Sequence, residues 1–157
     1  MTLLTLSRNK YFYKNIELQD TFETRIYLMF FHFSIMMIIF KRKGEKFSQK
    51  SYDSLFHNIE NNLRELGFGD VSVNKKMKDF NKILYDILLK IEIFKKDKFE
   101  INEKLILKYF KELNTERNEK IDNFKDYLMN FYNFCFELPL DNMIREAINF
   151  GNKYGST

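Results

Sequence analysis

The sequence predicts an all-α protein, a single-domain helical bundle built around one central buried apolar helix. Three observations carry this prediction. The 157 residues include one proline and five glycines, so few positions favour turns. Apolar residues recur at intervals of three and four through most of the chain, which is the spacing of one face of an α-helix. Residues 26–40, IYLMFFHFSIMMIIF, are apolar almost all the way round, as in a helix enclosed by others.

The central helix is expected to begin at Thr21 and to run to about Lys41, because Asp20 and Glu23 have the spacing of a capping box. Its apolar run measures about 22 Å, which is short of the roughly 30 Å hydrocarbon core of a bilayer. A histidine and a serine near its centre would lack partners in lipid but can find them inside a protein. We therefore expect this helix to be buried in the protein and not to span a membrane.

Two amphipathic helices follow the basic connector KRKGEK of residues 41–46. The first should end at Gly67, and its apolar stripe comprises Tyr52, Leu55, Phe56, Ile59, Leu63 and Leu66. The second should begin near Lys75, and its stripe comprises Met77, Phe80, Ile83, Leu84, Ile87, Leu88 and Ile91. Both stripes have the three- and four-residue spacing of helices that pack on one face.

The C-terminal part is expected to hold further helices and no strand. Residues 95–102, KKDKFEIN, are interpreted as a charged and polar end to the preceding helix. Asn102 can cap a helix that carries Leu105, Ile106, Tyr109, Phe110 and Leu113. A longer helix uses Ile121, Phe124, Leu128, Phe131 and Cys135. Pro139 then interrupts the chain, and a last helix over residues 141–150 should finish at Gly151 as a left-handed cap.

The sequence contains few residues that commonly act in catalysis or bind a metal ion or cofactor. His32 falls in the buried run and His57 on a polar helix face, and neither has neighbours at the spacing of metal ligands. Cys135 lies among aromatic residues and is expected to be a buried thiol, which suits a reducing compartment. The GFG of residues 67–69 lacks the third glycine of a dinucleotide motif and follows a helix. We therefore expect a binding protein and no enzyme, with no metal and no cofactor.

The N-terminal residues MTLLTLSRNKYFYK do not predict secretion. They contain no extended apolar core followed by small residues, and Glu17 and Asp20 appear early for an organellar transit peptide. We expect a cytoplasmic protein in a bacterial setting.

The segment LRELGFGDVSVNKKMK, residues 63–78, places two of the five glycines next to a group of lysines. Gly67 is expected to adopt the positive φ that ends a helix, and Gly69 to let the chain turn again. The cap of the next helix is expected at Asp70, Ser72 or Asn74. The apolar residues expected to pin this corner to the core are Phe68, Val71 and Val73.

Positive charge is concentrated in the first two thirds of the chain. Residues 1–46 hold eight basic and four acidic side chains, and residues 71–98 hold the same numbers. We expect the corner to present four cationic side chains together, namely Arg64, Lys75, Lys76 and Lys78. Such a surface favours anionic partners such as lipid headgroups or RNA, although lysines also simply solvate many helix faces.

The same segment, preceded by Asp53-Ser54-Leu55-Phe56, resembles a motif of the ubiquinol-cytochrome c chaperone family. That motif has an aspartate, a short apolar run, LRE, two glycines around an apolar residue, an aspartate and a basic end. The N-terminal part resembles the family independently, with the ordered residues Ser7-Arg8, Phe12-Tyr13, Asp20-Thr21, Arg25 and His32. The resemblance is strong over residues 7–85 and looser beyond.

The resemblance implies an assembly factor for the respiratory complex that oxidises ubiquinol. Family members are all-helical and have no known catalytic activity. Mitochondrial members work with a small helical partner, bind newly made cytochrome b and associate with the ribosome near its exit tunnel. For this chain it implies one chaperone domain over residues 1–157, with an N-terminal helix shortened relative to the family, peripheral at the cytoplasmic face of the inner membrane.

The resemblance also suggests where partners bind. The first candidate surface is the corner, with Arg64, Gly67, Phe68, Gly69, Asp70, Lys75, Lys76 and Lys78. A second candidate patch comprises Arg8, Phe12, Tyr13 and Arg25. Two departures weaken the likeness: Lys76 stands where arginine is common, and Asp86-Ile87 stands where the family often has glycine-arginine.

Two other functions remain open from the sequence. One is an RNA-binding or ribosome-binding helical module without a client protein. The other is a peripheral membrane protein that binds lipid or quinone in a cleft lined by Phe30, Phe31, Phe33 and Met36.

Overall fold

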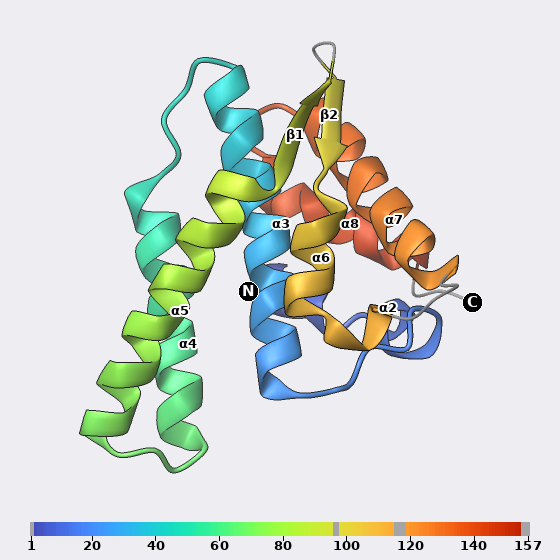
Figure 1. Ribbon diagram of the computed structural model, residues 1–157. Helices are drawn as coiled ribbons and strands as arrows, with labels where there is room; N and C mark the ends of the chain where they lie inside the picture. The colour runs from blue at the N-terminus through green and yellow to red at the C-terminus, as the bar shows by residue number, and fades with distance from the viewer. Residues whose placement is uncertain (1, 96–97, 115–118, 155–157) are drawn as a thin grey trace.

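The computed structural model describes residues 2–95, 98–114 and 119–154, and helices make up most of them (Figure 1). The helices are α1 (Thr2–Ser7), α2 (Lys10–Lys14), α3 (Phe22–Arg42), α4 (Gln49–Glu65), α5 (Asp70–Lys90), α6 (Glu103–Tyr109), α7 (Glu119–Phe136) and α8 (Met143–Tyr154). A two-stranded sheet, β1 (Glu92–Lys95) and β2 (Lys98–Ile101), and a short 3₁₀ helix, Lys111–Leu113, complete the described elements. The predicted all-α class is confirmed.

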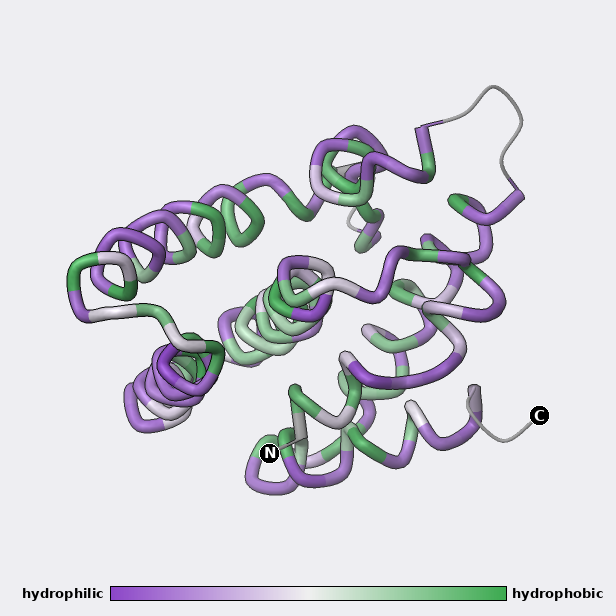
Figure 2. The backbone as a smooth tube through the Cα atoms, turned by 90° about the horizontal axis from the view of Figure 1, so that it is seen from below, coloured by the Kyte–Doolittle hydropathy of each residue, from purple (hydrophilic) through white to green (hydrophobic). Residues whose placement is uncertain are grey.

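Helix α3 is the central element, as predicted. Figure 2 shows it between the pair α4 and α5 on one side and the remaining helices on the other. It is long and apolar enough to cross a membrane, but 72% of its most apolar stretch is buried inside the protein. Its cap is Thr21, whose side chain accepts a hydrogen bond from the backbone of Thr24. Asp20 instead binds Arg25, with 2.6 Å between Oδ1 and Nη2.

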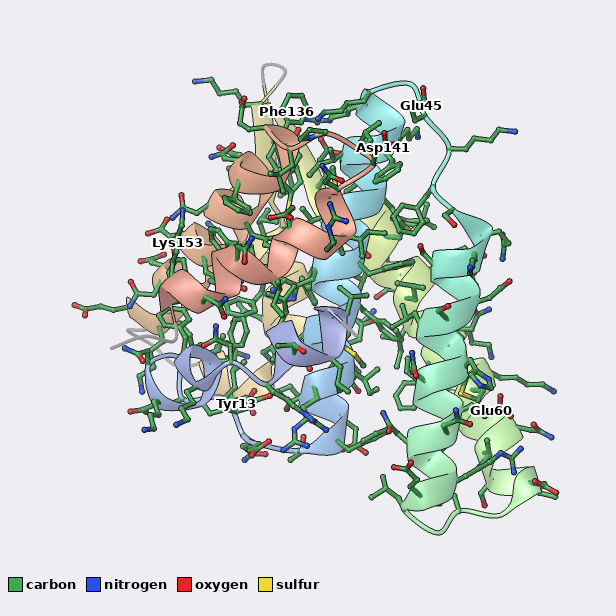
Figure 3. All side chains as sticks on the ribbon, turned by 180° about the vertical axis from the view of Figure 1, so that it is seen from behind. Tyr13, Glu45, Glu60, Phe136, Asp141 and Lys153 are labelled. Atoms are coloured by element: carbon green, nitrogen blue, oxygen red, sulfur yellow. The ribbon has the colours of Figure 1, made fainter. Side chains whose placement is uncertain are left out.

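Helices α4 and α5 form an antiparallel hairpin whose apolar stripes face each other and α3. Leu55, Ile59 and Leu63 of α4 are buried. The Tyr52 hydroxyl donates to Asn81 Oδ1 of α5 at 2.6 Å, which ties the two helices together. The end of the hairpin that holds the corner extends beyond the first turn of α3 (Figures 1 and 3).

Helix α5 begins at Asp70, five residues before the predicted start. Gly69 is its N-cap residue and Asp70 lies in the first turn, where a carboxylate interacts favourably with the helix dipole. Ser72 and Asn74 therefore lie inside the helix, so the prediction that one of these three residues would act as the cap was wrong.

The β-hairpin was not predicted. Its strands pair antiparallel, with Glu92 opposite Ile101 and Ile93 opposite Glu100. Phe99 and Ile101 point into the core, and the ring of Phe99 stacks on that of Tyr132 in α7 with centroids 4.0 Å apart. Part of the predicted polar ending, residues 96–97, lies outside the described residues.

The C-terminal helices follow the predicted order with two corrections. Asn102 caps α6 as expected, accepting a hydrogen bond from the backbone of Lys104 at 3.1 Å. However, α6 ends at Tyr109, so the 3₁₀ helix carries Leu113. Helix α7 ends before Pro139, as predicted.

Gly151 is not a helix cap, which corrects the second expectation. It lies inside α8, which continues to Tyr154. A Cβ atom at Gly151 would lie 2.8 Å from Leu6 Cδ2 of α1. Its carbonyl accepts a hydrogen bond from Asn9 Nδ2 at 2.6 Å. The missing side chain therefore lets the N-terminal segment approach α8 closely.

Candidate functional site

The corner between α4 and α5 is a short turn in which Gly67 has φ +96°. This is the positive φ that the sequence predicted. The Phe68 backbone N–H donates to Leu63 and the Gly67 N–H donates to Arg64, so the last carbonyls of α4 are satisfied. Gly69 has an ordinary extended conformation, with φ −77° and ψ 170°. The corner therefore has defined backbone hydrogen bonds.

Charges at the corner largely compensate one another. Arg64 pairs with Glu60 at 3.1 Å and closely with Asp70. The hydrogen bond that Arg64 donates to Asp70 is the main reason why the pKa of Arg64 is raised. Between residues 60 and 79 there are four basic and four acidic side chains, so the formal net charge of the corner is zero.

The lysines of the corner do not project together, which corrects the geometric expectation. Lys76 lies over the ring of Phe68, with Nζ 4.8 Å from the ring centroid. Lys75 and Lys78 are exposed and three residues apart, so they share one face of α5. At about 100° per residue, Lys76 points away from both. The corner thus separates the four predicted cations into a paired arginine, a stacked lysine and two exposed lysines.

Exposed apolar side chains distinguish the corner instead. Val71 is 85% exposed, Leu66 is 59% exposed and Phe68 is 39% exposed. Of the residues expected to pin the corner to the core, only Val73 is buried. Contiguous exposed apolar groups commonly mark a surface that binds a partner. The sequence stripe had placed Leu66 in the core, and the exposure of Val71 follows from the early start of α5.

The second candidate patch does not form one surface. Phe12 is fully buried, with its ring centroid 4.8 Å from that of Tyr127. The Tyr13 hydroxyl donates to the carbonyl of Ser7 at 2.6 Å, and burial raises the pKa of Tyr13 to about 12. Arg25 binds Asp20 through both Nε and Nη2. Of the four, Arg8 lines a cleft.

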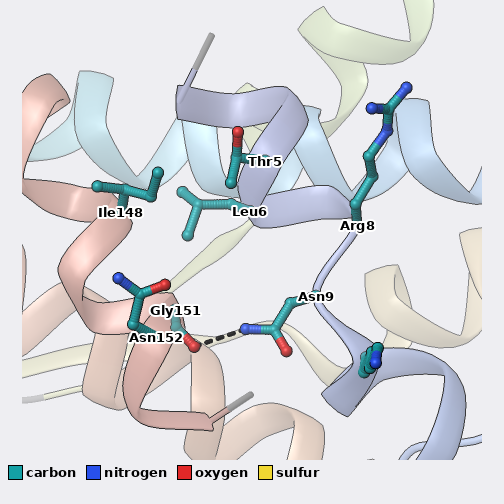
Figure 4. Close-up of a pocket in the computed structure, with 8 residues that line it drawn as sticks. Thr5, Leu6, Arg8, Asn9, Ile148, Gly151 and Asn152 are labelled. Atoms are coloured by element: carbon teal, nitrogen blue, oxygen red, sulfur yellow. Dashed lines mark hydrogen bonds between the residues drawn. The ribbon is translucent and has the colours of Figure 1, made fainter. Parts of the chain in front are cut away.

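That cleft lies between the N-terminal segment and α8 and has a volume of about 460 Å³ (Figure 4). Its lining residues are Thr5, Leu6, Arg8, Asn9, Lys10, Ile148, Gly151 and Asn152. The hydrogen bond from Asn9 to Gly151 crosses its floor. The cleft is wide and open, and sequence reasoning identified only Arg8 among its residues.

The aromatic cleft predicted for a lipid or quinone is present only in part. Phe33 and Met36 line a pocket of about 190 Å³ with Leu3, Lys50, Ser51, Ser54 and Ile144. Phe30 and Phe31 are fully buried and pack on other rings: Phe30 on Phe56 and Phe31 on Phe110.

Two of the residues that could carry catalysis, His32 and Cys135, are buried, whereas His57 is exposed. His32 Nδ1 lies 2.6 Å from the carbonyl of Leu28, and Nε2 lies 2.8 Å from the Tyr127 hydroxyl. Burial lowers the pKa of His32 to about 4, so the ring is neutral at pH 7, with Nδ1 donating and Nε2 accepting. Burial raises the pKa of the Cys135 thiol to about 12. Within the described ranges, no group of three or more His, Cys, Asp or Glu residues could hold a metal ion.

The chain was compared with protein-family models, curated proteins and solved structures. A family model described as Ubiquinol-cytochrome C chaperone matches residues 14–99, more than half of the chain. The matched segment includes α3, α4, the corner and α5. Neither the curated proteins nor the solved structures include a match.

Proposed function

The chain belongs to the ubiquinol-cytochrome c chaperone family, and from this premise we propose that it binds newly made cytochrome b while ubiquinol-cytochrome c reductase is assembled. The family supports the role of an assembly chaperone. The observation that carries the finer proposal is the exposed apolar corner within the matched segment.

The corner suits an apolar client because its apolar side chains are exposed and do not pack in the core of this protein. Burying a Leu, Val or Phe side chain against a partner contributes about 1.5–3 kcal/mol. Leu66, Phe68 and Val71 therefore supply enough free energy for reversible capture of an apolar segment. Lys75 and Lys78 beside them contact the polar edge of that segment, and the pairing of Arg64 with its neighbours stabilises the turn.

We place this activity at the cytoplasmic face of a bacterial inner membrane, without catalysis and without a cofactor. Burial of α3 supports a peripheral location, because this helix packs inside the protein. A small helical partner subunit and the ribosome are further proposed partners, and the family supports them only by analogy.

Deletion of the gene tests the role in the cell. In a strain that depends on ubiquinol-cytochrome c reductase, we expect lower b-type haem absorbance and less cytochrome b protein in the membranes. Unchanged amounts of both would reject the proposed function. Complementation with the intact gene is the control.

The corner itself is tested by capture of cytochrome b in detergent solution. Leu66→Ser combined with Phe68→Ser should weaken capture at least about tenfold, since two apolar contacts are lost. The matched control is Tyr85→Ser combined with Leu89→Ser, which alters two side chains of similar exposure at the other end of α5. Equal losses in the two variants would contradict a specific role of the corner.

Reversal of the three corner lysines, Lys75, Lys76 and Lys78, to glutamate should weaken capture less and leave helicity intact. A steep fall of wild-type capture with rising salt would instead indicate phosphate contacts, as in the RNA-binding alternative.

A further inference from the structure

The most exposed large apolar side chains follow one edge of the molecule. Within the described part of the chain, the six that stand out are Leu66, Phe68, Val71, Tyr85, Leu89 and Ile93. All of them fall between the end of α4 and the start of β1. The corner accounts for three of them. Two more lie at the far end of α5, where Leu89 is 79% exposed and Tyr85 is 49% exposed, and Ile93 lies in β1. A single function at the corner does not explain this second group.

Helix α5 connects the two groups through a regular outer stripe, which consists of Val71, Lys75, Lys78, Lys82, Tyr85 and Leu89. These residues are spaced by four, three, four, three and four positions and are all exposed. At about 100° per residue they project within about 80° of one another, over about 27 Å of helix. A second series with the same spacing, from Val73 to Ile91, faces the protein core. The outer stripe is therefore the face of α5 opposite its packing face.

The middle of the outer stripe is cationic. No described contact joins Lys75, Lys78 or Lys82 to a carboxylate. Asp86 lies beside the stripe but is already engaged by Lys90 and Lys108, at 2.6 and 2.7 Å, and by the Tyr109 hydroxyl. Partial burial would raise the pKa of Asp86, but these hydrogen bonds outweigh it and hold the pKa well below its usual range. The three lysines therefore face solvent without a described ion pair, and the exposed Asp79 lies beside Lys75 and Lys82 at the edge of the stripe.

The position of α5 leaves this stripe accessible. Helix α5 forms an outer edge of the molecule in Figure 1, and Figure 2 shows the α4–α5 hairpin on one flank of the bundle. Every residue of the stripe is also exposed, so the stripe faces solvent along its length.

We propose that the outer stripe of α5 rests on an anionic lipid bilayer, with its apolar ends in the headgroup region and its lysines on lipid phosphates. The apolar residues at the two ends can enter the headgroup region, Tyr85 is of a residue type enriched at membrane interfaces, and the three lysines between them match anionic headgroups. Each lysine near an anionic surface contributes attraction, and its long stem keeps the ammonium group in water. A second copy of the chain is a poor occupant, because antiparallel pairing would set lysines against lysines.

This inference rests on the proposed function for its location at a membrane. The stripe shares Val71, Lys75 and Lys78 with the corner and extends beyond it to Lys82, Tyr85 and Leu89. An elongated contact along α5 would hold the hairpin against the bilayer. The corner at the end of the hairpin would then lie close to the bilayer surface, where an apolar segment of the client enters the membrane.

The test is binding of the purified chain to vesicles of phosphatidylcholine with and without phosphatidylglycerol, measured by flotation. We expect binding only to the vesicles that contain phosphatidylglycerol. Reversal of Lys75, Lys78 and Lys82 to glutamate should lower the partition coefficient at least about tenfold. Reversal of the exposed lysines Lys14, Lys104 and Lys111 changes the net charge equally on other surfaces and should lower it much less.

The variant Tyr85→Ser with Leu89→Ser separates this inference from the proposed function. It should lose vesicle binding about tenfold while keeping wild-type capture of cytochrome b in detergent and wild-type helicity by circular dichroism. Wild-type vesicle binding by this variant or by the stripe lysine variant would overturn the inference. An equal loss of vesicle binding in the stripe lysine variant and in the Lys14, Lys104 and Lys111 variant would also overturn it, because binding would then depend on net charge and not on the stripe. Loss of cytochrome b capture with intact vesicle binding in the corner variant would leave the inference standing.

Discussion

The helices α1–α3 and α6–α8, here called the aromatic body, and the α4–α5 hairpin use apolar residues in opposite ways. In the body, rings from distant segments enclose one another: Phe12 contacts His32, Phe124 and Tyr127, and His32 also packs on Phe131 at 4.7 Å. In the hairpin, one face of each helix is buried while Leu66, Val71 and Leu89 face solvent. The body therefore buries its apolar side chains, whereas the hairpin leaves several of them exposed.

The body and the hairpin also differ in whether their contacts join distant or neighbouring parts of the chain. The body joins the N-terminal segment to α8 through Asn9 and Gly151, and α3 to α7 through His32 and Tyr127. Such contacts between residues far apart in the chain make the body a cooperative unit. The corner instead relies on local contacts, such as the pairs that Arg64 makes with Glu60 and Asp70.

The largest expected effect is the loss of a ring from the body. Phe124 is fully buried and contacts Phe12, Phe31 and Phe110. Phe124→Ala should lower the free energy of unfolding by about 3–5 kcal/mol, because it removes buried apolar area and leaves a cavity. Urea unfolding followed by circular dichroism measures this change. A cost below about 1 kcal/mol would show that the body is loosely packed and would remove the contrast with the hairpin.

A smaller effect is expected from acid acting on His32. Its folded-state pKa is about 4, below the ordinary value of 6.5, so the unfolded chain takes up a proton in this interval while the folded protein does not. Stability should therefore fall as the pH drops from about 6.5 to about 4, by up to about 3 kcal/mol. The depressed pKa of Asp86 adds its own loss only at lower pH.

The comparison of wild type with His32→Gln isolates this contribution. Both proteins are unfolded with urea at pH 7 and at pH 4.5, and the variant should be less stable at pH 7 but less sensitive to acid. Equal acid sensitivity in both proteins would show that His32 is hydrated and does not belong to the rigid body.

The smallest effect is expected at the exposed end of the hairpin. Val71→Ser should change the free energy of unfolding by no more than about 0.5 kcal/mol, because this side chain is 85% exposed. The same urea unfolding measures it. A decrease in the free energy of unfolding above about 1 kcal/mol would mean that Val71 packs on the protein in solution. Val71 would then not be free to bind a partner.

Local signals in the sequence predicted much of the fold. Gly67 with positive φ and Asn102 as a cap are confirmed. Helix α3 begins at Phe22, one residue after the predicted Thr21, which is its N-cap in place of Asp20. These features depend on residues a few positions apart, so spacing and side-chain chemistry suffice to recognise them. The family resemblance is likewise confirmed by the match over residues 14–99.

Features that depend on distant neighbours were missed. The β-hairpin is encoded in a lysine-rich segment, and its stability comes from Phe99 on Tyr132 and from Arg42, which pairs with Glu92. Gly151 has the sequence context of a cap, but the close approach of Leu6 explains why glycine stands there. Nothing in the local pattern of either segment reveals these partners.

The candidate site shows the same limit. The sequence identified the corner and its residues, because two glycines before a lysine group are a local pattern. It did not show that Arg64 is paired, that Lys76 stacks on Phe68 or that Val71 is exposed. Those facts depend on where α5 begins, which Gly69 and the packing of Val73 together decide.

By itself, the sequence determined the helical class, the buried central helix, the position of the corner and the family. These follow from periodicity and from residues close together in the chain. Only the tertiary structure decided which apolar residues remain outside, because burial depends on what packs against each face. An exposed stripe on α5 and a buried one have the same spacing, and only the neighbouring helices distinguish them.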